Sequence, residues 1–389
     1  MILTNKQEEG LKLAVERYKN NEKYCVIAGY AGTGKSTLIK FITAALDIQE
    51  DEIVYTSLTG KATQVLLKKG NKNISTLHKL LYNWRPLPSG GYFKVPVDKI
   101  PYKIVVVDEV SMVPKSLIQD LMKYDCYVIF CGDPYQLPQI SKEDTHTLLD
   151  NPHIFLDEVM RQAAESEIIR LSMDIRAQKP LVRILGDEAM VLDKKELNTG
   201  MLTWADQIIC AKNETRFSLN MQMKEILGKG KLPAEGDKVI CLRNYWETLS
   251  DSKLPLVNGT IGYISNIYES HIQYPPYLGN LKVPYLGVDF MSDTDDLFKI
   301  DIDKIKLTEE RNIIDWKTSY KINKSSRYKG TLPLEFAYGY AITCHKAQGS
   351  EWDKVLVVEE NFPFSAEEHS RWLYTAVTRA SEKLVVIKR

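Results

Sequence analysis

Residues Gly29 to Ser36 read GYAGTGKS, which fits the pattern G-x-x-x-x-G-K-[ST] at every fixed position. Residues 24–28 (YCVIA) before it form a short apolar run typical of a buried strand, and residues 37–42 (TLIKFI) after it have helical spacing. A glycine loop between a strand and a helix presents unpaired backbone N–H groups and the positive end of the helix dipole to a polyphosphate. The sequence therefore predicts a nucleoside triphosphate site, in preference to a glycine-rich turn without a ligand.

An acidic pair supplies the second half of such a site. Residues 104–107 (IVVV) read as a buried strand that ends directly in Asp108 and Glu109. In a phosphate-loop enzyme the first carboxylate holds Mg²⁺, partly through water, and the second orients or deprotonates the attacking water. Lys35 is expected to reach the β- and γ-phosphates, and the Ser36 hydroxyl to bind Mg²⁺. The expected cofactors are ATP and Mg²⁺.

A third apolar run, residues 126–131 (CYVIFC), leads into residues 132–138 (GDPYQLP). The amide of Gln136 is placed there to sense the γ-phosphate. The loop is bounded by prolines, so it is suited to carry that signal to another part of the molecule.

The composition limits the class of protein. At 389 residues, with 44% hydrophobic and 26% charged residues, the chain is long enough for two or three globular domains. Its 51 basic and 51 acidic residues cancel, which argues against a static nucleic-acid packager but not against a motor that repeatedly releases its track. The six cysteines contain no C-x-x-C pair and are expected to be buried thiols. The sequence shows no signal peptide and no apolar run of membrane-spanning length, which predicts a cytoplasmic protein without a membrane partner.

Two segments combine a hydroxyl at a helix start with a nearby cation, residues 59–62 (TGKA) and residues 75–81 (STLHKLL). Hydroxyls, backbone N–H groups and cations all bind the phosphate oxygens of a nucleic-acid backbone. Most such threonines are plain helix caps, so both roles stay open at this point.

Residues 82–100 (YNWRPLPSGGYFKVPVDKI) interrupt the alternation of strand and helix patterns. The turn at residues 89–91 lies between two short arms that carry aromatic side chains. This pattern favours a projecting β-hairpin over a disordered loop.

The order of these motifs resembles that of the superfamily 1 helicases. GYAGTGKS, TGKAT, STLHKLL, DEVSM and GDPYQLPQI follow one another, and AITCHKAQGS (residues 341–350) and LYTAVTRA (residues 373–380) match the last two motifs. Within that superfamily the chain is most similar to the RecD/Dda-like branch, whose members translocate 5′ to 3′ on single-stranded DNA. The likeness spans nearly the whole chain and is weakest from about residue 265 to 330.

The resemblance implies which residues complete the sites. Arg161, within residues 155–162 (FLDEVMRQ), and Arg379 are expected to reach the γ-phosphate from a second motor domain. The expected catalytic residues are Lys35, Asp108, Glu109, Gln136, Arg161 and Arg379. The expected nucleotide-binding residues are Gln7, Gly29, Ala31, Gly32, Thr33, Gly34, Lys35, Ser36, Thr37, Gln348 and Gly349. The expected nucleic-acid contacts are Thr59, Lys61, Thr76, His78, Asn213, Thr343, His345 and Lys346.

For three features of the sequence, two interpretations stay open. Gln7 completes a capping-box pattern in residues 4–7 (TNKQ) and also stands where several helicase families place a glutamine that reads the adenine edge. The hairpin aromatics either split a duplex or pack against a neighbouring domain, and they are Trp84, Tyr92 and Phe93. The basic stretch at residues 321–329 (KINKSSRYK) is either a solvated surface loop or a DNA contact.

The resemblance also implies an α/β fold with two RecA-like parallel-sheet motor domains. The first is expected at residues 1–154, with a β-hairpin at residues 82–100 protruding from it. The second is expected at residues 155–231 and 331–389. A small SH3-like β-barrel, whose N-G turn lies in residues 257–262 (VNGTIG), is expected to be inserted at residues 232–330.

The expected function is that of an ATP-dependent 5′-to-3′ DNA helicase or translocase in replication, repair or recombination. Its expected partners are single-stranded DNA, single/double-strand junctions and a single-strand-binding or replication/recombination protein, with the chain acting as a monomer. Alternatives are an RNA helicase, a translocase that strips bound protein from a strand, and a phosphate-loop small-molecule kinase. The kinase does not explain the segments HKAQGS and YTAVTRA.

Overall fold

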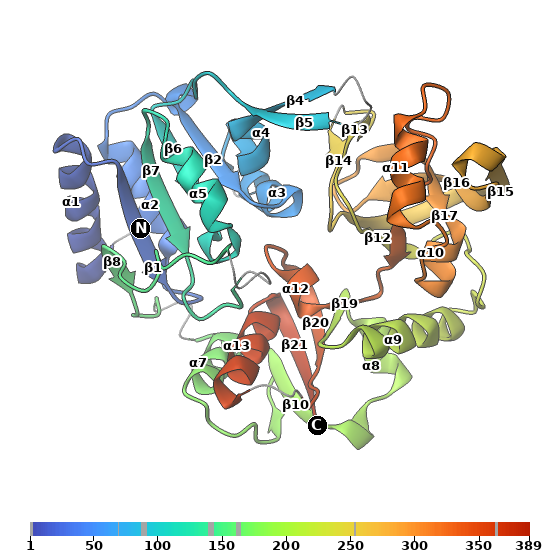
Figure 1. Ribbon diagram of the computed structural model, residues 1–389. Coiled ribbons are helices and arrows are strands. Elements are labelled where there is room, and N and C mark those ends of the chain that lie inside the picture. Colours follow the sequence, from blue (N-terminus) through green and yellow to red (C-terminus); the bar gives the residue numbers. More distant parts are fainter. Residues whose placement is uncertain are drawn as a thin grey trace. The chain divides into compact units, whose positions relative to one another are not determined.

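The structure of the protein is a computed structural model, and it describes residues 3–68, 70–86, 92–138, 144–160, 165–252, 254–361 and 365–389 (Figure 1). By their contacts the residues divide into two units. Unit 1 comprises residues 1–82, 96–211 and 343–389, and unit 2 comprises residues 83–95 and 212–342.

Unit 1 is an α/β structure. Its strands are β1 (Tyr24–Gly29), β2 (Ile53–Ser57), β3 (Ile74–Thr76), β6 (Ile104–Val107), β7 (Tyr127–Gly132), β8 (Ile154–Leu156), β9 (Ile184–Leu185), β10 (Ala189–Asp193), β11 (Gln207–Cys210), β20 (Trp352–Val358) and β21 (Ala380–Lys388). Its helices are α1 (Asn5–Lys19), α2 (Lys35–Ala45), η1 (Glu50–Glu52), α3 (Gly60–Lys68), α4 (Leu77–Leu81), η2 (Val110–Met112), α5 (Lys115–Leu121), α7 (Glu167–Arg176), η4 (Lys194–Glu196), α8 (Thr199–Trp204), α12 (Cys344–Ala347) and α13 (Ala366–Val377).

The first sheet of unit 1 is parallel throughout, in the order β3-β2-β6-β7-β1-β8. Side chains alternate between its faces, so Cys25 and Ile27 of β1 pack in one core with α1 and α2, whereas Val26 and Ala28 join a second core with α4 and α5. Burial of both faces is typical of a parallel sheet. Because β6, β7 and β1 are parallel neighbours, the loops that follow them meet at one edge of the sheet.

The second sheet of unit 1 has the order β19-β11-β20-β21-β10-β9, where β19 is Ala341–Thr343. The pairs β11–β20, β20–β21 and β21–β10 are parallel, and β9 runs antiparallel to β10. Helix α13 packs beside α7 and leads into β21 through Thr378 and Arg379. We call the first sheet with its helices the first lobe and the second sheet with its helices the second lobe.

Unit 2 contains a five-stranded sheet in the order β17-β16-β15-β12-β18 and two two-stranded sheets, β13-β14 and β4-β5. The paired strands of the large sheet are antiparallel. The strands are β4 (Tyr82–Pro86), β5 (Tyr92–Pro96), β12 (Lys238–Cys241), β13 (Tyr245–Leu249), β14 (Pro255–Leu256), β15 (Ile261–Gln273), β16 (Lys282–Ser292), β17 (Leu297–Asp303) and β18 (Phe336–Tyr338). The helices are α9 (Asn213–Ile226), η5 (Pro276–Leu278), α10 (Lys304–Glu309) and α11 (Trp316–Lys324).

A buried ion pair holds α9 to the large sheet of unit 2. The side chains of Lys224 and Asp237 are 1% and 0% exposed, and they form a salt bridge. Lys224 Nζ also donates to the carbonyl of Leu232 at 2.8 Å, and Tyr340 Oη donates to Asp237 at 3.0 Å. Because burying a charge is costly unless it is paired and hydrogen-bonded, this network ties α9 firmly to the start of β12.

The prediction of an α/β protein with a parallel-sheet core is confirmed. The contacts group α9 with the inserted sheet, whereas the sequence motifs placed its residues in the second motor domain. Strands β4 and β5 pair with each other, and the residues between them, 87–91, lie outside the described part of the chain. Among the helices of the described residues, none combines the length and the apolar content needed to span a bilayer.

Candidate active site

The loop between β1 and α2 has the shape that phosphate binding requires. Gly32 and Gly34 have φ angles of +75° and +79°, in the left-handed region that glycine adopts without steric cost. A Cβ added at Gly34 would lie 2.4 Å from Gln7 Nε2, so no larger residue fits there without displacing that amide. The loop delivers the chain to the N-terminus of α2, where N–H groups without a partner inside the helix favour an anion.

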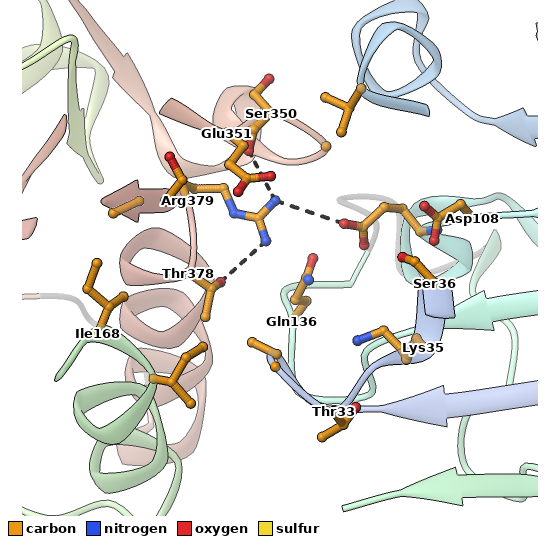
Figure 2. Close-up of a pocket in the computed structure, with 18 of the residues that line it drawn as sticks. Thr33, Lys35, Ser36, Asp108, Gln136, Ile168, Ser350, Glu351, Thr378 and Arg379 are labelled. Atoms are coloured by element: carbon orange, nitrogen blue, oxygen red, sulfur yellow. Dashed lines mark hydrogen bonds and ion pairs between the residues drawn. The ribbon is translucent and has the colours of Figure 1, made fainter. Parts of the chain in front are cut away.

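A cavity of about 460 Å³ opens beside this loop within unit 1 (Figure 2). The first lobe lines it with residues 31–37, Ala62, Val65, Asp108, Glu109 and Gln136, and the second lobe with Ser166, Ile168, Ile169, 349–351 and 378–381. Figure 2 shows Arg379 and Thr378 on one side of the cavity, Lys35 and Ser36 on the other, and Gln136 between them. The cavity is therefore built by both lobes.

Lys35 and Ser36 stand at the first turn of α2. Lys35 Nζ donates to the carbonyl oxygens of Gly29 and Tyr30, each at 2.9 Å, which holds the ammonium group against the loop. Ser36 is exposed in the cavity, and Asp108 lines the cavity as well. A hydroxyl and a carboxylate are oxygen ligands of the kind Mg²⁺ prefers, so the donor set fits the ion that the sequence predicts.

Glu109 has an unusual backbone conformation. Its φ angle is +52°, in the left-handed region that costs a non-glycine residue on the order of 1–3 kcal/mol. Its N–H donates to Asp108 Oδ1 at 3.0 Å, and both carboxylates line the cavity. Such strain is common at active sites, where the surrounding structure enforces a geometry that the isolated chain disfavours.

Arg379 reaches Glu109 and Gln136 from the second lobe. The side chain is buried, Nε donates to the carbonyl of Thr375 at 3.0 Å, and Nη1 donates to that of Ser350 at 3.4 Å. Nη1 also lies 3.9 Å from Glu109 Oε1. With the Gln136 amide oriented to suit its neighbours, its nitrogen donates to Glu109 Oε2 and its oxygen accepts from Arg379 Nη2, each at 3.2 Å.

The structure thus brings five of the six expected catalytic residues into one cavity: Lys35, Asp108, Glu109, Gln136 and Arg379. Arg161 lies outside the described residues. Of the expected nucleotide-binding residues, those from Ala31 to Thr37 line the cavity together with Gly349, which has a φ angle of +71°. Gln348 is buried and donates to the carbonyl of Leu137 at 2.7 Å, so it links the lobes beside the cavity.

Gln7 performs the structural role that its capping pattern predicts. Its side-chain oxygen accepts from the Thr4 N–H at 3.0 Å, and its own N–H donates to the Thr4 hydroxyl at 3.3 Å. Its amide nitrogen donates to the carbonyl of Thr33 at 3.1 Å, so the same side chain also touches the phosphate-binding loop. Reading of the adenine edge by Gln7 stays a prediction.

A further contact between the lobes was not predicted from the sequence. The hydroxyl of Tyr374, on α13, accepts from the Ala31 N–H at 2.8 Å and donates to Asp133 Oδ2 at 2.6 Å. Asp133 is 1% exposed, and this burial raises the pKa of its carboxyl group. Nearby, the Leu137 N–H donates to the Thr375 hydroxyl at 2.9 Å. The available signals were that Asp133 follows an apolar strand pattern directly and that Tyr374 stands within the apolar segment WLYTAV.

We expect Tyr374→Phe to lower the free energy of unfolding by roughly 1.5–3 kcal/mol, because a buried carboxyl group loses its hydrogen-bond donor while the ring volume is kept. Urea denaturation of the wild type and the variant measures this. Tyr124→Phe is the matched control, since its hydroxyl donates to the Val97 carbonyl at 2.8 Å in a half-buried place. Equal losses in the two variants would contradict a special role for Tyr374.

The expected nucleic-acid contacts lie in several places. Thr59 and Thr76 cap helices, accepting from Ala62 N and Lys79 N, each at 3.2 Å. Lys61 is buried, and its Nζ lies 4.7 Å from the ring centroid of Trp352. The other expected contacts are His78 beside Tyr82, the exposed Asn213 at the start of α9, and Thr343, His345 and Lys346 around α12. Their role in binding nucleic acid stays a prediction, and the side chains of Trp84, Tyr92 and Phe93 lie outside the described part.

Two family models match the chain. The model of an AAA domain matches residues 3–195, and the model of a UvrD-like helicase C-terminal domain matches residues 338–387. The first match contains the phosphate-binding loop, Glu109 and Gln136, and the second contains Arg379. Both matched regions therefore contribute to the cavity, the second of them through residues 349–351 and 378–381.

Several relatives carry the name of an ATP-dependent DNA helicase. The chain is 26% identical over 366 residues to the ATP-dependent RecD2 DNA helicase of Deinococcus radiodurans. This alignment covers 92% of this chain and 46% of that protein. The chain is 29% identical over 192 residues to the ATP-dependent DNA helicase dda of Enterobacteria phage T4. This alignment covers 46% of this chain and 43% of that protein. The matches thus span less than half the length of these two relatives.

A solved structure shares the fold. The crystal structure of Pif1 helicase from Bacteroides in complex with ADP-AlF3 and single-stranded DNA has a TM-score of 0.54 at 16% sequence identity, covering 99% of this chain and 92% of that one. The parallel-sheet core of unit 1 is accordingly RecA-like. The two matched domain models, these relatives and this fold agree with the resemblance of the chain to the superfamily 1 helicases of the RecD/Dda-like branch.

Proposed function

We propose that the protein is an ATP-driven DNA motor, a 5′-to-3′ helicase or translocase whose ATPase is coupled to movement on single-stranded DNA. The observation that carries this proposal is the meeting of Arg379 with Glu109 and Gln136 across one cavity. A cavity closed by two lobes can convert the loss of a phosphate into a relative movement. A simple nucleotide-binding protein has no need of such an arrangement.

Several polar residues of the cavity have separate roles in ATP hydrolysis. Lys35 and the N–H groups of the loop bind the phosphates, and Ser36 with Asp108 would hold Mg²⁺, which neutralises charge on the phosphate oxygens when bound. Glu109 orients and deprotonates the attacking water. Arg379 stabilises the negative charge that develops on the transferred phosphoryl group, and Gln136 connects Arg379 to Glu109. Arg161 is proposed as a second cation of the same kind.

Coupling between the lobes follows from the contact between Arg379 and Glu109. Arg379 rests near Glu109, at 3.9 Å, where a terminal phosphate would compete for the guanidinium group. Gain or loss of that phosphate therefore changes which group holds the second lobe. Thermodynamic linkage requires that if nucleotide changes DNA affinity, DNA changes nucleotide affinity by the same factor.

The finer architecture belongs to the same proposal. We assign motor domains to residues 1–154 and to residues 155–231 with 331–389, a protruding hairpin to residues 82–100, and an SH3-like barrel to residues 232–330. The pairing of β4 with β5 and the antiparallel five-stranded sheet support the last two. The track is single-stranded DNA, entered at single/double-strand junctions, and the chain acts as a monomer. Thr343 supports a strand contact, since it precedes α12 without capping it through its side chain.

The proposal is tested by measuring the dissociation constant of a fluorescent ATP analogue with and without saturating (dT)20, together with steady-state ATP hydrolysis. We expect the oligonucleotide to stimulate hydrolysis and to change nucleotide affinity by a factor within the usual coupling range of about 5–150. Unwinding of duplexes with a 5′ tail, but not with a 3′ tail, supports the direction. If neither DNA nor RNA oligonucleotides change the rate of ATP hydrolysis, the protein is not a nucleic-acid motor. If RNA stimulates hydrolysis more than DNA, the motor moves on RNA.

A further inference from the structure

Helix α11 borders a groove in unit 2 that has no role in the proposed motor. The groove has a volume of about 540 Å³. One face of α11 lines it, formed by Trp316, Ser319, Tyr320, Asn323 and Lys324, and the other lining residues include residues 312–314, 332–333 and Arg243. Positions i, i+3, i+4, i+7 and i+8 of a helix share one face, so these five side chains form a continuous stripe.

Two large aromatic side chains of this stripe are exposed to an unusual degree. Trp316 is 74% exposed and Tyr320 is 53% exposed. The helix does not need them for its own packing, because it is anchored by Ile322, which is fully buried in a core with Tyr274, Leu278 and Val283. Exposed aromatic residues on an anchored helix typically mark a surface that binds something.

The same helix and the turn after it carry a concentration of positive charge. Lys317, Lys321, Lys324 and Arg327 are all exposed, and within the described residues none of them forms an ion pair. The carboxylate of Asp315, at the start of the helix, accepts hydrogen bonds from Lys317 N at 2.8 Å and Thr318 N at 2.9 Å as the helix cap. The cations are therefore available to an anionic ligand.

Cations and rings lie together along the stripe. Lys324 Nζ is 4.4 Å from the ring centroid of Tyr320, and Lys317 Nζ is 5.8 Å from that of Trp316. Of the carboxylates that line the groove, Glu335 is paired with Arg243 at 2.8 Å, and burial raises the pKa of Asp303. The groove is thus lined by two aromatic rings and flanked by positive charge, and its carboxylate Glu335 is paired with Arg243.

This chemistry fits a single-stranded polynucleotide better than an acidic peptide. Unpaired bases stack on exposed aromatic rings whatever their sequence, and lysines beside the rings bind the phosphates between the bases. An acidic peptide would pair with the cations, but the two exposed aromatic rings would add little to its affinity. We propose that the groove between α11 and residues 312–314 is a second contact site for single-stranded nucleic acid, an inference that rests on the proposed motor function.

The test is the affinity of fluorescein-labelled (dT)20 for the wild type and for the double variant Trp316→Ala/Tyr320→Ala at several salt concentrations. We expect the dissociation constant to rise about tenfold or more, because stacking of one base is worth roughly a factor of ten. In Lys317→Gln/Lys324→Gln the slope of log affinity against log salt should fall by about 0.7 for each lost phosphate contact. A 20-base-pair duplex, whose bases are not free to stack, should respond little to loss of the rings.

Controls separate this inference from folding and from the motor proposal. Tyr277→Ala removes an aromatic side chain that is 66% exposed in the same unit but outside the groove, so its affinity for (dT)20 should equal that of the wild type. If the thermal unfolding midpoint of Trp316→Ala/Tyr320→Ala equals that of the wild type, the double variant is folded. If the wild type binds (dT)20 and is stimulated by it, while the double variant binds equally well, the groove assignment is overturned and the motor stands. Loss of binding to oligoglutamate but not to (dT)20 would also overturn it, in favour of a peptide site.

Discussion

Arg379→Ala is expected to lower kcat for ATP hydrolysis by about a thousandfold or more, while the dissociation constant for ATP changes far less. An arginine that faces the transferred phosphoryl group stabilises charge that develops only in the transition state, and such arginines are worth about 10³–10⁵ in rate. The geometry supports this role, because the guanidinium group is buried, held by the carbonyls of Thr375 and Ser350, and aimed at the cavity. Single-turnover hydrolysis and equilibrium nucleotide binding separate the two effects.

Two companion variants sharpen that experiment. Arg371→Ala removes an arginine of the same helix whose side chain is 31% exposed, lies 3.4 Å from Glu367 and does not line the cavity, so kcat should stay near the wild-type value. Arg379→Lys keeps the positive charge but lacks the planar set of N–H donors of a guanidinium group. Its kcat should therefore lie between those of Arg379→Ala and the wild type. A parallel loss of binding and turnover in Arg379→Ala would indicate a ground-state binding role.

Glu109→Gln is expected to keep ATP binding and slow hydrolysis by about 10²–10⁴, the usual contribution of a general base. The amide is nearly isosteric but cannot take a proton from water. It also keeps the contact with Gln136, whose amide can rotate to suit the new partner. Hydrolysis is measured under single-turnover conditions, so that slow product release does not hide the change.

A competing carboxylate makes the test decisive. Among the described residues, Glu351 lines the same cavity from the second lobe. If Glu109 is the base, Glu351→Gln turns over much faster than Glu109→Gln. The reverse order would assign the base to Glu351 and contradict the role given to Glu109.

Much of the nucleotide site could be predicted because its parts are local. A glycine loop, a strand end with two acids and a strand end with a glutamine are each contained within a few residues. The parallel order β6-β7-β1 then brings the three loops to one edge of the sheet. Arg379 was predicted only through the resemblance, since an arginine after an amphipathic helix is ordinarily a surface residue.

The rest depended on contacts between segments far apart in the chain. Nothing local to Tyr374 indicates that its hydroxyl lies between Asp133 and Ala31, more than two hundred residues away. From the sequence alone, the basic stretch at residues 321–329 is either a solvated surface loop or a DNA contact. The structure shows that Lys324 ends a helix whose exposed aromatic face begins earlier, at Trp316.

The most direct measurement is a crystal structure of the protein with Mg²⁺ and a non-hydrolysable ATP analogue. The account predicts that Arg379 leaves Glu109 and lies within about 3 Å of the terminal phosphate oxygens, with Lys35 bound to the same phosphate group. A structure in which the analogue occupies the loop while Arg379 stays on Glu109, away from the phosphate, would contradict an ATP site shared by the two lobes.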